Sequence, residues 1–405
     1  MGIFNFRYLQ APAKACGLVF LALVVCICGQ AHDNEEDSVS AENQHFSLDC
    51  DLSQYQLKPR SEREDLHHKA SLIVQLLESV EHDELPRVNY CVGDAEMYSW
   101  TNVPGRRSGG IRLGDLGDVS RDRAWAALRA LLSESGFAKV ELLATDIERA
   151  SGAGTVADYT IAVFGNPRID SAWGFQFDGH HIALNFLVHG DNLVLAPLFL
   201  GAQPLTINGQ TPLSDEIHYG RKLFHSLSEE QRKAALMEGL VRRDVMAGSG
   251  SGHVDRGKDF SVEEFANVGI PLSELSDPQM DLAKDLLEVY LSNLASPHAE
   301  EVHDAIEPKI TNGFFTFSRL GDRVYYRIYI PDALLIEYDD VASDHLHTVM
   351  RLLDEQHLND YGPFASHASQ HSTPLLTLVH HYVHDRSHKD STFPAERVRG
   401  TPAAR

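Results

Sequence analysis

The chain has 405 residues, of which 43% are hydrophobic and 23% are charged, a balance that excludes a disordered, collagen-like or coiled-coil protein and allows a full core. Its 35 Lys and Arg residues are outnumbered by 58 Asp and Glu residues, which gives a formal net charge of −23 at pH 7. A surface of that charge repels phosphate backbones and anionic lipid headgroups, so nucleic acid is not an expected partner.

The N-terminus is typical of a secretory signal peptide. Arg7 and Lys14 precede an apolar run over residues 16–29, and small residues at its end fit cleavage after Ala31. The run is shorter than the roughly 20 residues that a membrane-spanning helix needs. We therefore predict that residues 1–31 are removed and that the mature protein is secreted or periplasmic, without membrane contact. A retained membrane anchor is the alternative.

Two cysteines remain after this cleavage, Cys50 and Cys91. In an oxidising compartment such a pair predicts one disulfide, and two separate buried thiols are the alternative. Closing the loop between them would stabilise the fold by roughly 3–4 kcal/mol in the chain-entropy account.

Helices and then strands are expected in the first half of the chain. Apolar residues recur at helical spacing over residues 61–80, and Ser120 begins a second expected helix that ends at Gly136. After a Gly-rich break the period changes to two residues, and Asp178-Gly179 predicts a two-residue hairpin turn in an antiparallel meander. The expected strands cover residues 156–164, 172–177, 180–188 and 193–200.

A helical section follows, and strands then return. The expected helices cover residues 214–226, 228–246, 278–294 and 299–307, and the expected strands cover residues 313–319, 324–330 and 334–339. Ser228 and Gln231 have the spacing of a capping box. We predict an α+β fold: a single domain with antiparallel sheet segments before and after a helical middle section. No internal repeat is visible.

This domain is expected over residues 60–390. An acidic N-terminal segment over residues 32–59 would precede it, and a flexible tail over residues 391–405 would follow.

Several short blocks together resemble the domain of unknown function 3500 family. In chain order they are Gly179-His180-His181 through Asn185, Ala196 to Pro204, Leu227 to Arg232, Tyr326 to Tyr338, Asp344 to Arg351, and Asp360-Tyr361-Gly362. The resemblance covers roughly residues 60 to 385 and implies a secreted or periplasmic protein with one such domain, but no established activity. It also implies that residues 345–347 are a strand. In the family pattern Arg351 is close to Asp360, a further candidate site residue, whereas here residues 352–359 intervene.

The first candidate site residues lie on the strand expected over residues 180–188. Alternation places His181 and Asn185 on one face of it and His180 on the other, apolar face. His181 and Asn185 are therefore the predicted polar pair. His180 is predicted to be a buried, hydrogen-bonded structural residue.

Glu337 lies in an apolar strand, where a carboxylate is costly unless it is paired or binds a metal. His345 and His347 follow after a short interval, and in an extended chain both imidazoles point to the same side. Two such imidazoles with a carboxylate are typical of a zinc or other transition-metal site with open positions. The alternative is a helix begun by Asp344, in which the two rings would diverge by about 200°.

Another histidine group stands near the C-terminus, where His380, His384 and His388 would share one helical face. Such a face can bind a divalent metal, and the alternative is a favourable interaction with the end of the helix dipole.

The motifs of several large enzyme classes do not occur: there is no serine elbow, Walker loop, dinucleotide fingerprint or Cys-x-x-Cys. Metal chemistry or histidine and carboxylate acid–base chemistry remains. We therefore predict a metal-dependent hydrolase with His181, His345 and His347 as ligands of a divalent metal, zinc first and copper or iron otherwise.

Three further residues would act beside that metal. Glu337 would take part in catalysis, and Arg327 or Arg351 would orient an anionic group of a small-molecule substrate. A non-catalytic extracellular module that binds a small ligand in the same pocket is one alternative, and a copper or iron oxidoreductase is another.

Overall fold

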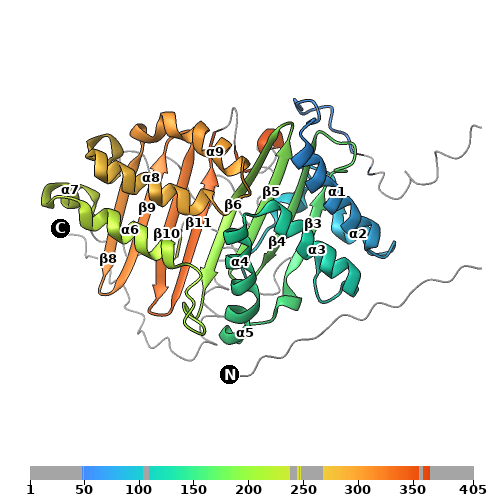
Figure 1. The fold of residues 1–405 in the computed structure, drawn as a ribbon, viewed down its shortest axis with the longest axis horizontal. Coiled ribbons are helices and arrows are strands. Elements are labelled where there is room, and N and C mark those ends of the chain that lie inside the picture. The colour runs from blue at the N-terminus through green and yellow to red at the C-terminus, as the bar shows by residue number, and fades with distance from the viewer. Residues whose placement is uncertain are drawn as a thin grey trace, which may run out of the picture. The chain divides into compact units, whose positions relative to one another are not determined.

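An eleven-stranded sheet runs through the described part of the chain (Figure 1). The strand order is β1-β3-β4-β5-β6-β11-β10-β9-β8-β7, with β2 paired to β3 at one end. The computed structural model describes residues 48, 50–103, 109–237, 244–245, 247, 268–354 and 359–364. The predicted signal peptide, the predicted tail and the histidines at 380, 384 and 388 lie outside the described residues.

The first half of the chain begins with helices and ends in a meander. Its helices are α1 (Glu64–Ser79), α2 (Leu85–Val88), α3 (Asp118–Leu131), α4 (Glu134–Leu142) and α5 (Glu148–Ser151). The short strands β1 (Asn89–Tyr90) and β2 (Ile111–Arg112) lie among them, and the meander consists of β3 (Thr160–Phe164), β4 (Ala172–Gly179), β5 (Ile182–His189) and β6 (Asn192–Ala202).

The second half has the same plan. Its helices are α6 (Ser214–Ser226), α7 (Glu229–Ala235), α8 (Asp277–Leu291) and α9 (His298–Ile306), with the short strand β7 (Ile270–Pro271) before α8. Its meander consists of β8 (Phe314–Leu320), β9 (Arg323–Ile330), β10 (Leu334–Ala342) and β11 (His345–Leu352).

The two halves have a similar order of elements, helices followed by a four-stranded meander, which the sequence analysis did not recognise. In each half the first helix packs on a later one, α1 on α3 and α6 on α8. The last strands of the two meanders, β6 and β11, pair antiparallel in the middle of the sheet, with Gly201 opposite His347. The middle hairpin of each meander also has a non-glycine residue at positive φ, His181 at 64° and Asp332 at 54°. The predicted α+β class is confirmed, and the two predicted sheet segments are joined into one sheet.

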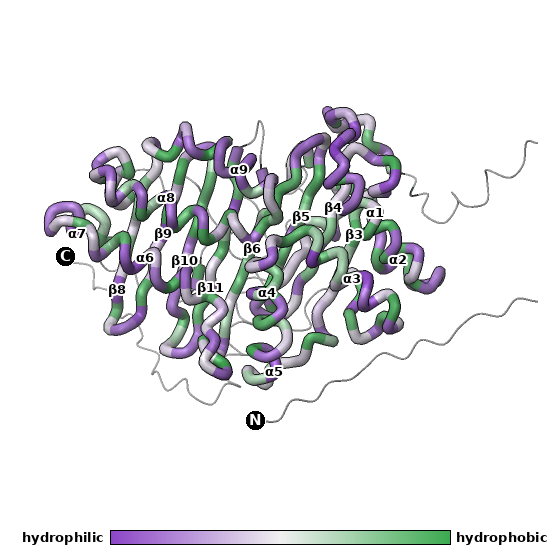
Figure 2. Tube along the Cα trace, in the orientation of Figure 1, coloured by the Kyte–Doolittle hydropathy of each residue, from purple (hydrophilic) through white to green (hydrophobic). Residues whose placement is uncertain are grey.

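The helices of both halves cover the same face of the sheet (Figure 1), and hydrophilic and hydrophobic residues alternate along them (Figure 2). On that face Tyr326 of β9 donates a hydrogen bond to the backbone oxygen of Glu216 in α6, at 2.7 Å. Its hydroxyl lies 2.9 Å from that of Tyr290 in α8. Because side chains alternate along a strand, Arg327, Glu337 and His347 point to the opposite face.

That opposite face is also buried. Its apolar part is a small separate cluster of Trp100, Ala183, Phe199, Val245, Ala247, Tyr329, Leu335 and Val349. Residues from outside the sheet, Trp100, Val245 and Ala247, therefore lie against the strands on this side. The candidate site residues on this face are enclosed among them rather than exposed.

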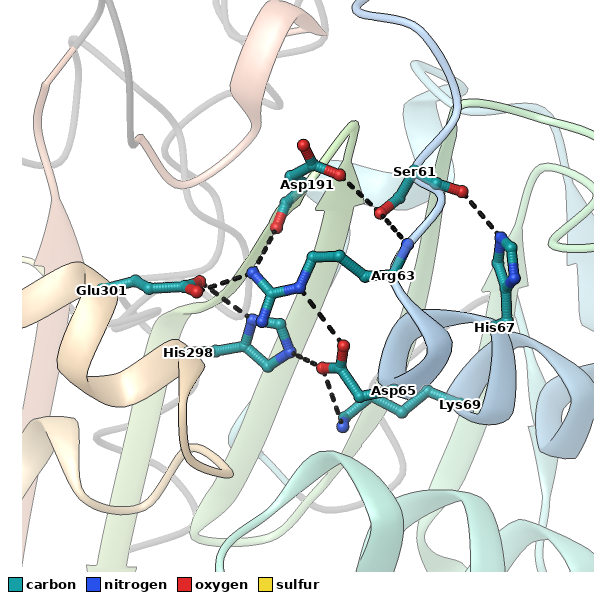
Figure 3. Close-up of polar contacts among 8 residues, drawn as sticks. All are labelled: Ser61, Arg63, Asp65, His67, Lys69, Asp191, His298 and Glu301. Atoms are coloured by element: carbon teal, nitrogen blue, oxygen red, sulfur yellow. Dashed lines mark hydrogen bonds and ion pairs between the residues drawn. The ribbon is translucent and has the colours of Figure 1, made fainter.

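A polar network joins the two halves where the start of α1 meets α9 (Figure 3). Arg63 Nη1 donates a hydrogen bond to Glu301 Oε1 at 2.6 Å. His298, which is fully buried, has its Nε2 2.6 Å from Asp65 Oδ2. Burial and the nearby Arg63 charge lower the pKa of His298, whereas Asp65 acts in the opposite direction. The network thus ties a helix of the first half to a helix of the second.

Several sequence predictions of local structure are wrong. The single helix expected from Ser120 to Gly136 is two helices, and Ser120 lies inside α3 while Gly136 lies inside α4. The strand expected from residue 156 begins at Thr160, after a short 3-10 turn. The hairpin turn does not fall at Asp178-Gly179, which belong to β4, but at His180 and His181. Gly179 is needed for a different reason: a Cβ there would lie 2.7 Å from the ring of Tyr159. The helix predicted over residues 228–246 ends at Ala235, because the chain then pairs with β8 through a bridge between Leu236 and Phe317.

Other local predictions hold. The capping box of Ser228 and Gln231 is present at the start of α7. Residues 345–347 are extended within β11, as the family resemblance implies, and the helical alternative begun by Asp344 is wrong. Cys50 and Cys91 form the predicted disulfide, with a Cα separation of 5.6 Å.

Candidate metal centre

The three histidines predicted as metal ligands come together at one end of the central strands. His345 and His347 are alternate residues at the start of β11, and His181 is the second residue of the turn between β4 and β5. Strand β6 lies between β5 and β11 in the sheet. The rings of His181 and His347 therefore approach each other over β6, beside Gly201.

Their Nε2 atoms converge. Nε2 of His345 lies 2.9 Å from Nε2 of His181 and 2.9 Å from Nε2 of His347. All three side chains are buried, with exposed fractions of 4% for His181, 7% for His345 and 1% for His347. A neutral imidazole nitrogen offers either one proton or one lone pair, so Nε2 of His345 is poorly suited to two nitrogen partners at once. A cation between the rings would instead receive all three lone pairs.

Asp244 contacts His347 on the side of the ring that is turned away from the other two histidines. Its Oδ1 lies 2.7 Å from Nδ1 of His347, the ring nitrogen that does not face the other histidines. A carboxylate on the second nitrogen of a ligating histidine keeps the proton on that nitrogen and leaves the first one free to bind a metal. Sequence reasoning missed Asp244, which lies 103 residues from His347 inside a segment predicted to be helical.

Further carboxylates make the surroundings of His347 acidic. Asp339 pairs directly with His347 across β10 and β11 and is 2% exposed. Burial raises its pKa to about 8; Arg323 opposes this shift, and the charges of Asp244 and Asp340 add to it. Such a concentration of carboxyl groups favours a cation at the neighbouring histidines.

Glu337 lies on the same face, two residues along β10 from Asp339, and is fully buried. Both of its oxygens accept hydrogen bonds: Oε1 from the hydroxyl of Tyr325 at 2.5 Å, and Oε2 from the backbone N–H of Ala247 at 2.7 Å. These bonds satisfy a carboxylate that would otherwise be costly in an apolar strand. One of them also fastens Ala247 to the sheet.

The predicted arginines lie further along the strands. Arg351 is four residues from His347 on β11, roughly 13 Å at the rise of a strand. Its Nε donates to Asp360 Oδ2 at 2.5 Å and its Nη1 to the backbone oxygen of Ala247 at 3.0 Å. Arg351 and Asp360 thus form a buried ion pair, although residues 352–359 separate them in the sequence. Arg327 is 1% exposed, and its Nη2 lies 3.3 Å from Thr316 Oγ1.

The remaining candidates surround the triad or lie apart from it. His180 is in the turn rather than on a strand face; its ring stacks on that of His181 at 3.7 Å between centroids, and its Nδ1 lies 2.7 Å from Glu148 Oε2. Asn185 is buried in β5 and donates a hydrogen bond to the backbone oxygen of Pro197 at 2.7 Å. Neither belongs to the group of converging ring nitrogens.

Comparison with known proteins identifies the family. Residues 62–363 match the model of the DUF3500 family, described as proteins of unknown function, and because this is most of the chain, the protein belongs to that family. No curated protein and no solved structure gives a significant match. Within the part of the chain that the structure describes, no helix has the length and apolar character required to cross a membrane.

Proposed function

We propose that this member of the DUF3500 family is a metal-dependent hydrolase. Its divalent metal, with zinc as the favoured candidate, would be held by Nε2 of His181, His345 and His347. The observation that supports this most directly is the convergence of three buried Nε2 atoms, with that of His345 lying 2.9 Å from each of the other two. Three histidines leave at least one coordination position open, which is typical of catalytic rather than structural zinc sites.

The donor set fits such a metal. Three neutral imidazoles suit zinc, copper and iron, and zinc binds imidazole nitrogen at about 2.0–2.1 Å, so the rings would need to separate only slightly to admit it. When bound, the metal would supply an activated water with a pKa near 7, the nucleophile of hydrolysis. Asp244 would keep His347 in the binding tautomer.

Residues beyond the triad stay predictions. Glu337 lies on the same face of the sheet as His347, but its two oxygens are held by Tyr325 and Ala247. The orienting role predicted for Arg327 and Arg351 toward an anionic substrate group is likewise untested. We propose secretion as the setting of this chemistry, because the Cys50–Cys91 disulfide is compatible with an oxidising compartment.

Metal content is the first test. Protein purified without an affinity tag and dialysed against metal-free buffer is expected to retain about one equivalent of a transition metal by elemental analysis. His347→Ala should lose it while keeping a native circular dichroism spectrum. His218→Ala is the control, because that histidine is exposed on α6. Less than a tenth of an equivalent in the unaltered protein, even after zinc is added back, contradicts the proposal.

Turnover separates hydrolysis from the alternatives. A panel of small ester, phosphoester and amide substrates should show hydrolysis that a chelator abolishes and zinc alone restores. Restoration by copper or iron but not by zinc would point to an oxidoreductase instead. A protein that binds zinc tightly and turns over none of the panel would favour the non-catalytic binding module.

A further inference from the structure

Gly201 lies between the elements that carry the histidines. It is near the end of β6, directly opposite His347 of β11, and its backbone N–H donates to the backbone oxygen of His181 at 2.7 Å. The two ligands on either side of β6 are therefore both adjacent to this one residue. A side chain at position 201 would stand where their rings meet.

The missing side chain is sterically required. A Cβ on Gly201 would lie 2.8 Å from Cδ2 of His347, 3.1 Å from Cδ2 of His181 and 3.0 Å from the backbone oxygen of Leu346. Carbon atoms in contact prefer separations of about 3.5–4.0 Å. Gly201 is not among the residues with positive φ, so the glycine is not needed for its backbone conformation. Its role is to leave room.

Neither ring is free to move away. The ring of His347 is held at Nδ1 by Asp244, and its backbone is paired with strands on both sides. The backbone of His181 has φ of 64° and donates its N–H to the oxygen of Asn102 at 3.1 Å, and its ring stacks on that of His180 with 3.7 Å between centroids. A methyl group at position 201 would therefore displace the imidazoles or the strands rather than be absorbed by a flexible side chain.

We propose that Gly201 is a positioning residue of the metal centre, whose lack of a side chain allows the rings of His181 and His347 to converge on one ion. This inference rests on the proposed metal binding. It assigns to a residue without any functional group a direct influence on metal affinity, and it makes β6 the floor of the site although this strand carries none of the ligands.

The test compares Gly201→Ala with Gly174→Ala in the full chain. Gly174 is a matched control because it is also a strand glycine in this sheet, where a Cβ would lie 3.0 Å from the backbone oxygen of Phe186. Zn²⁺ is added to metal-free protein in competition with a chromophoric chelator, and Co²⁺ is added as a spectroscopic probe. We expect Gly201→Ala to weaken Zn²⁺ binding by about tenfold or more and to change the visible Co²⁺ spectrum. Gly174→Ala should alter neither.

A second measurement covers the case in which Gly201→Ala destabilises the fold. The unfolding free energy of metal-free protein is measured for Gly201→Ala alone and in a His347→Ala background. If the methyl group meets the His347 ring, its cost should be smaller in that background. An equal cost in both backgrounds, or unchanged Zn²⁺ affinity and Co²⁺ spectrum in Gly201→Ala, overturns the inference. Absence of metal binding by the unaltered protein would instead overturn the proposed function.

Discussion

Oδ1 of Asp244 lies 2.7 Å from Nδ1 of His347, while Nε2 of the same ring faces His345 at 2.9 Å. One imidazole is therefore held from both of its nitrogens. The carboxylate fixes the tautomer and the orientation of the ring, and the remaining lone pair is directed at the other histidines.

Removing this carboxylate should weaken metal binding without removing a ligand. We expect Asp244→Ala to lower Zn²⁺ affinity by about 10- to 100-fold, the usual effect of losing such a partner, and Asp244→Asn to lower it less. Competition with a chelator measures both. Asp332→Asn is the control, an exposed turn residue at the other end of the strands. Equal affinities in all four proteins would show that Asp244 has no such role.

The backbone of His181 predicts that one substitution removes metal binding without lowering the stability of the metal-free protein. A non-glycine residue at φ of 64° costs about 1 kcal/mol or more, and such strain is often found at functional sites. His181→Gly should therefore abolish Zn²⁺ binding while leaving the metal-free unfolding free energy unchanged or raising it by about 1 kcal/mol. His347→Gly, in the middle of a regular strand, should lower both quantities. Urea unfolding of the metal-free proteins decides between these outcomes.

The Arg351–Asp360 pair is expected to be structural. Both side chains are almost fully buried, and Asp360 Oδ1 also accepts the backbone N–H of Leu352 at 2.7 Å. Asp360→Asn removes the negative charge that faces the buried guanidinium of Arg351, and breaking a buried ion pair in this way typically costs about 3–5 kcal/mol. Asp322→Asn, at an exposed ion pair with Arg319, should cost less than about 1 kcal/mol. A small effect of Asp360→Asn on thermal unfolding would argue against a structural role.

The disulfide should contribute strongly to stability. Cys50 and Cys91 are 41 residues apart, and closing a loop of that length is worth about 4 kcal/mol in the chain-entropy account. The Cys50→Ser/Cys91→Ser variant should lose about this much unfolding free energy. Treating the unaltered protein with a reductant should produce the same loss, and the reductant should not affect the double variant.

A half-buried histidine away from the metal centre should contribute to the loss of stability in acid. The ring of His189 accepts a hydrogen bond from the backbone N–H of Lys58, and burial together with the Lys58 charge lowers its pKa from 6.5 to about 4. Between pH 6.5 and 4, His189 is therefore protonated in the unfolded chain but remains neutral in the folded protein. This contribution to stability is complete above pH 6.5 and is lost as the pH falls toward 4.

The variant His189→Gln keeps an acceptor but does not titrate, so it should lose less stability than the unaltered protein between pH 7 and pH 5. Urea unfolding at the two pH values measures the difference. His218→Gln, exposed on α6, should follow the unaltered protein. Parallel pH dependence in all three proteins would contradict the assignment.

Local patterns in the sequence were sufficient for much of the sheet but not for its assembly. The strand β11 was implied by the family resemblance, since its local pattern fitted a helix begun by Asp344 as well. Once the segment is extended, alternation places His345 and His347 on one side, because the period of side chains in a strand is a local property. The pairing of β6 with β11 depends on contacts between residues about 150 positions apart, which no local pattern contains. His181 lies at the site because it is in the turn between β4 and β5, which the sequence analysis placed two residues too early. Gly179 was interpreted as a turn residue, but it is required because Tyr159 packs against it.

The supporting residues of the site were hidden for the same reason. Asp244 lies in a segment whose composition resembles a helix, and its relation to His347 exists only once the chain has folded over the sheet. Gly201 has no functional group to draw attention to it. Glu337, by contrast, was conspicuous in sequence because a carboxylate in an apolar strand needs partners, and the structure supplies them as Tyr325 and Ala247.

The central pairing of β6 with β11 implies that the chain can be divided. A cut in the connection between Ala202 and Ser214 would yield two polypeptides, each ending its meander with an open hydrogen-bonding edge. Such edges are expected to recombine on mixing. One polypeptide would carry His181, and the other would carry His345 and His347. An ion bound by all three histidines would therefore link two separate molecules. Zinc should promote their reassembly.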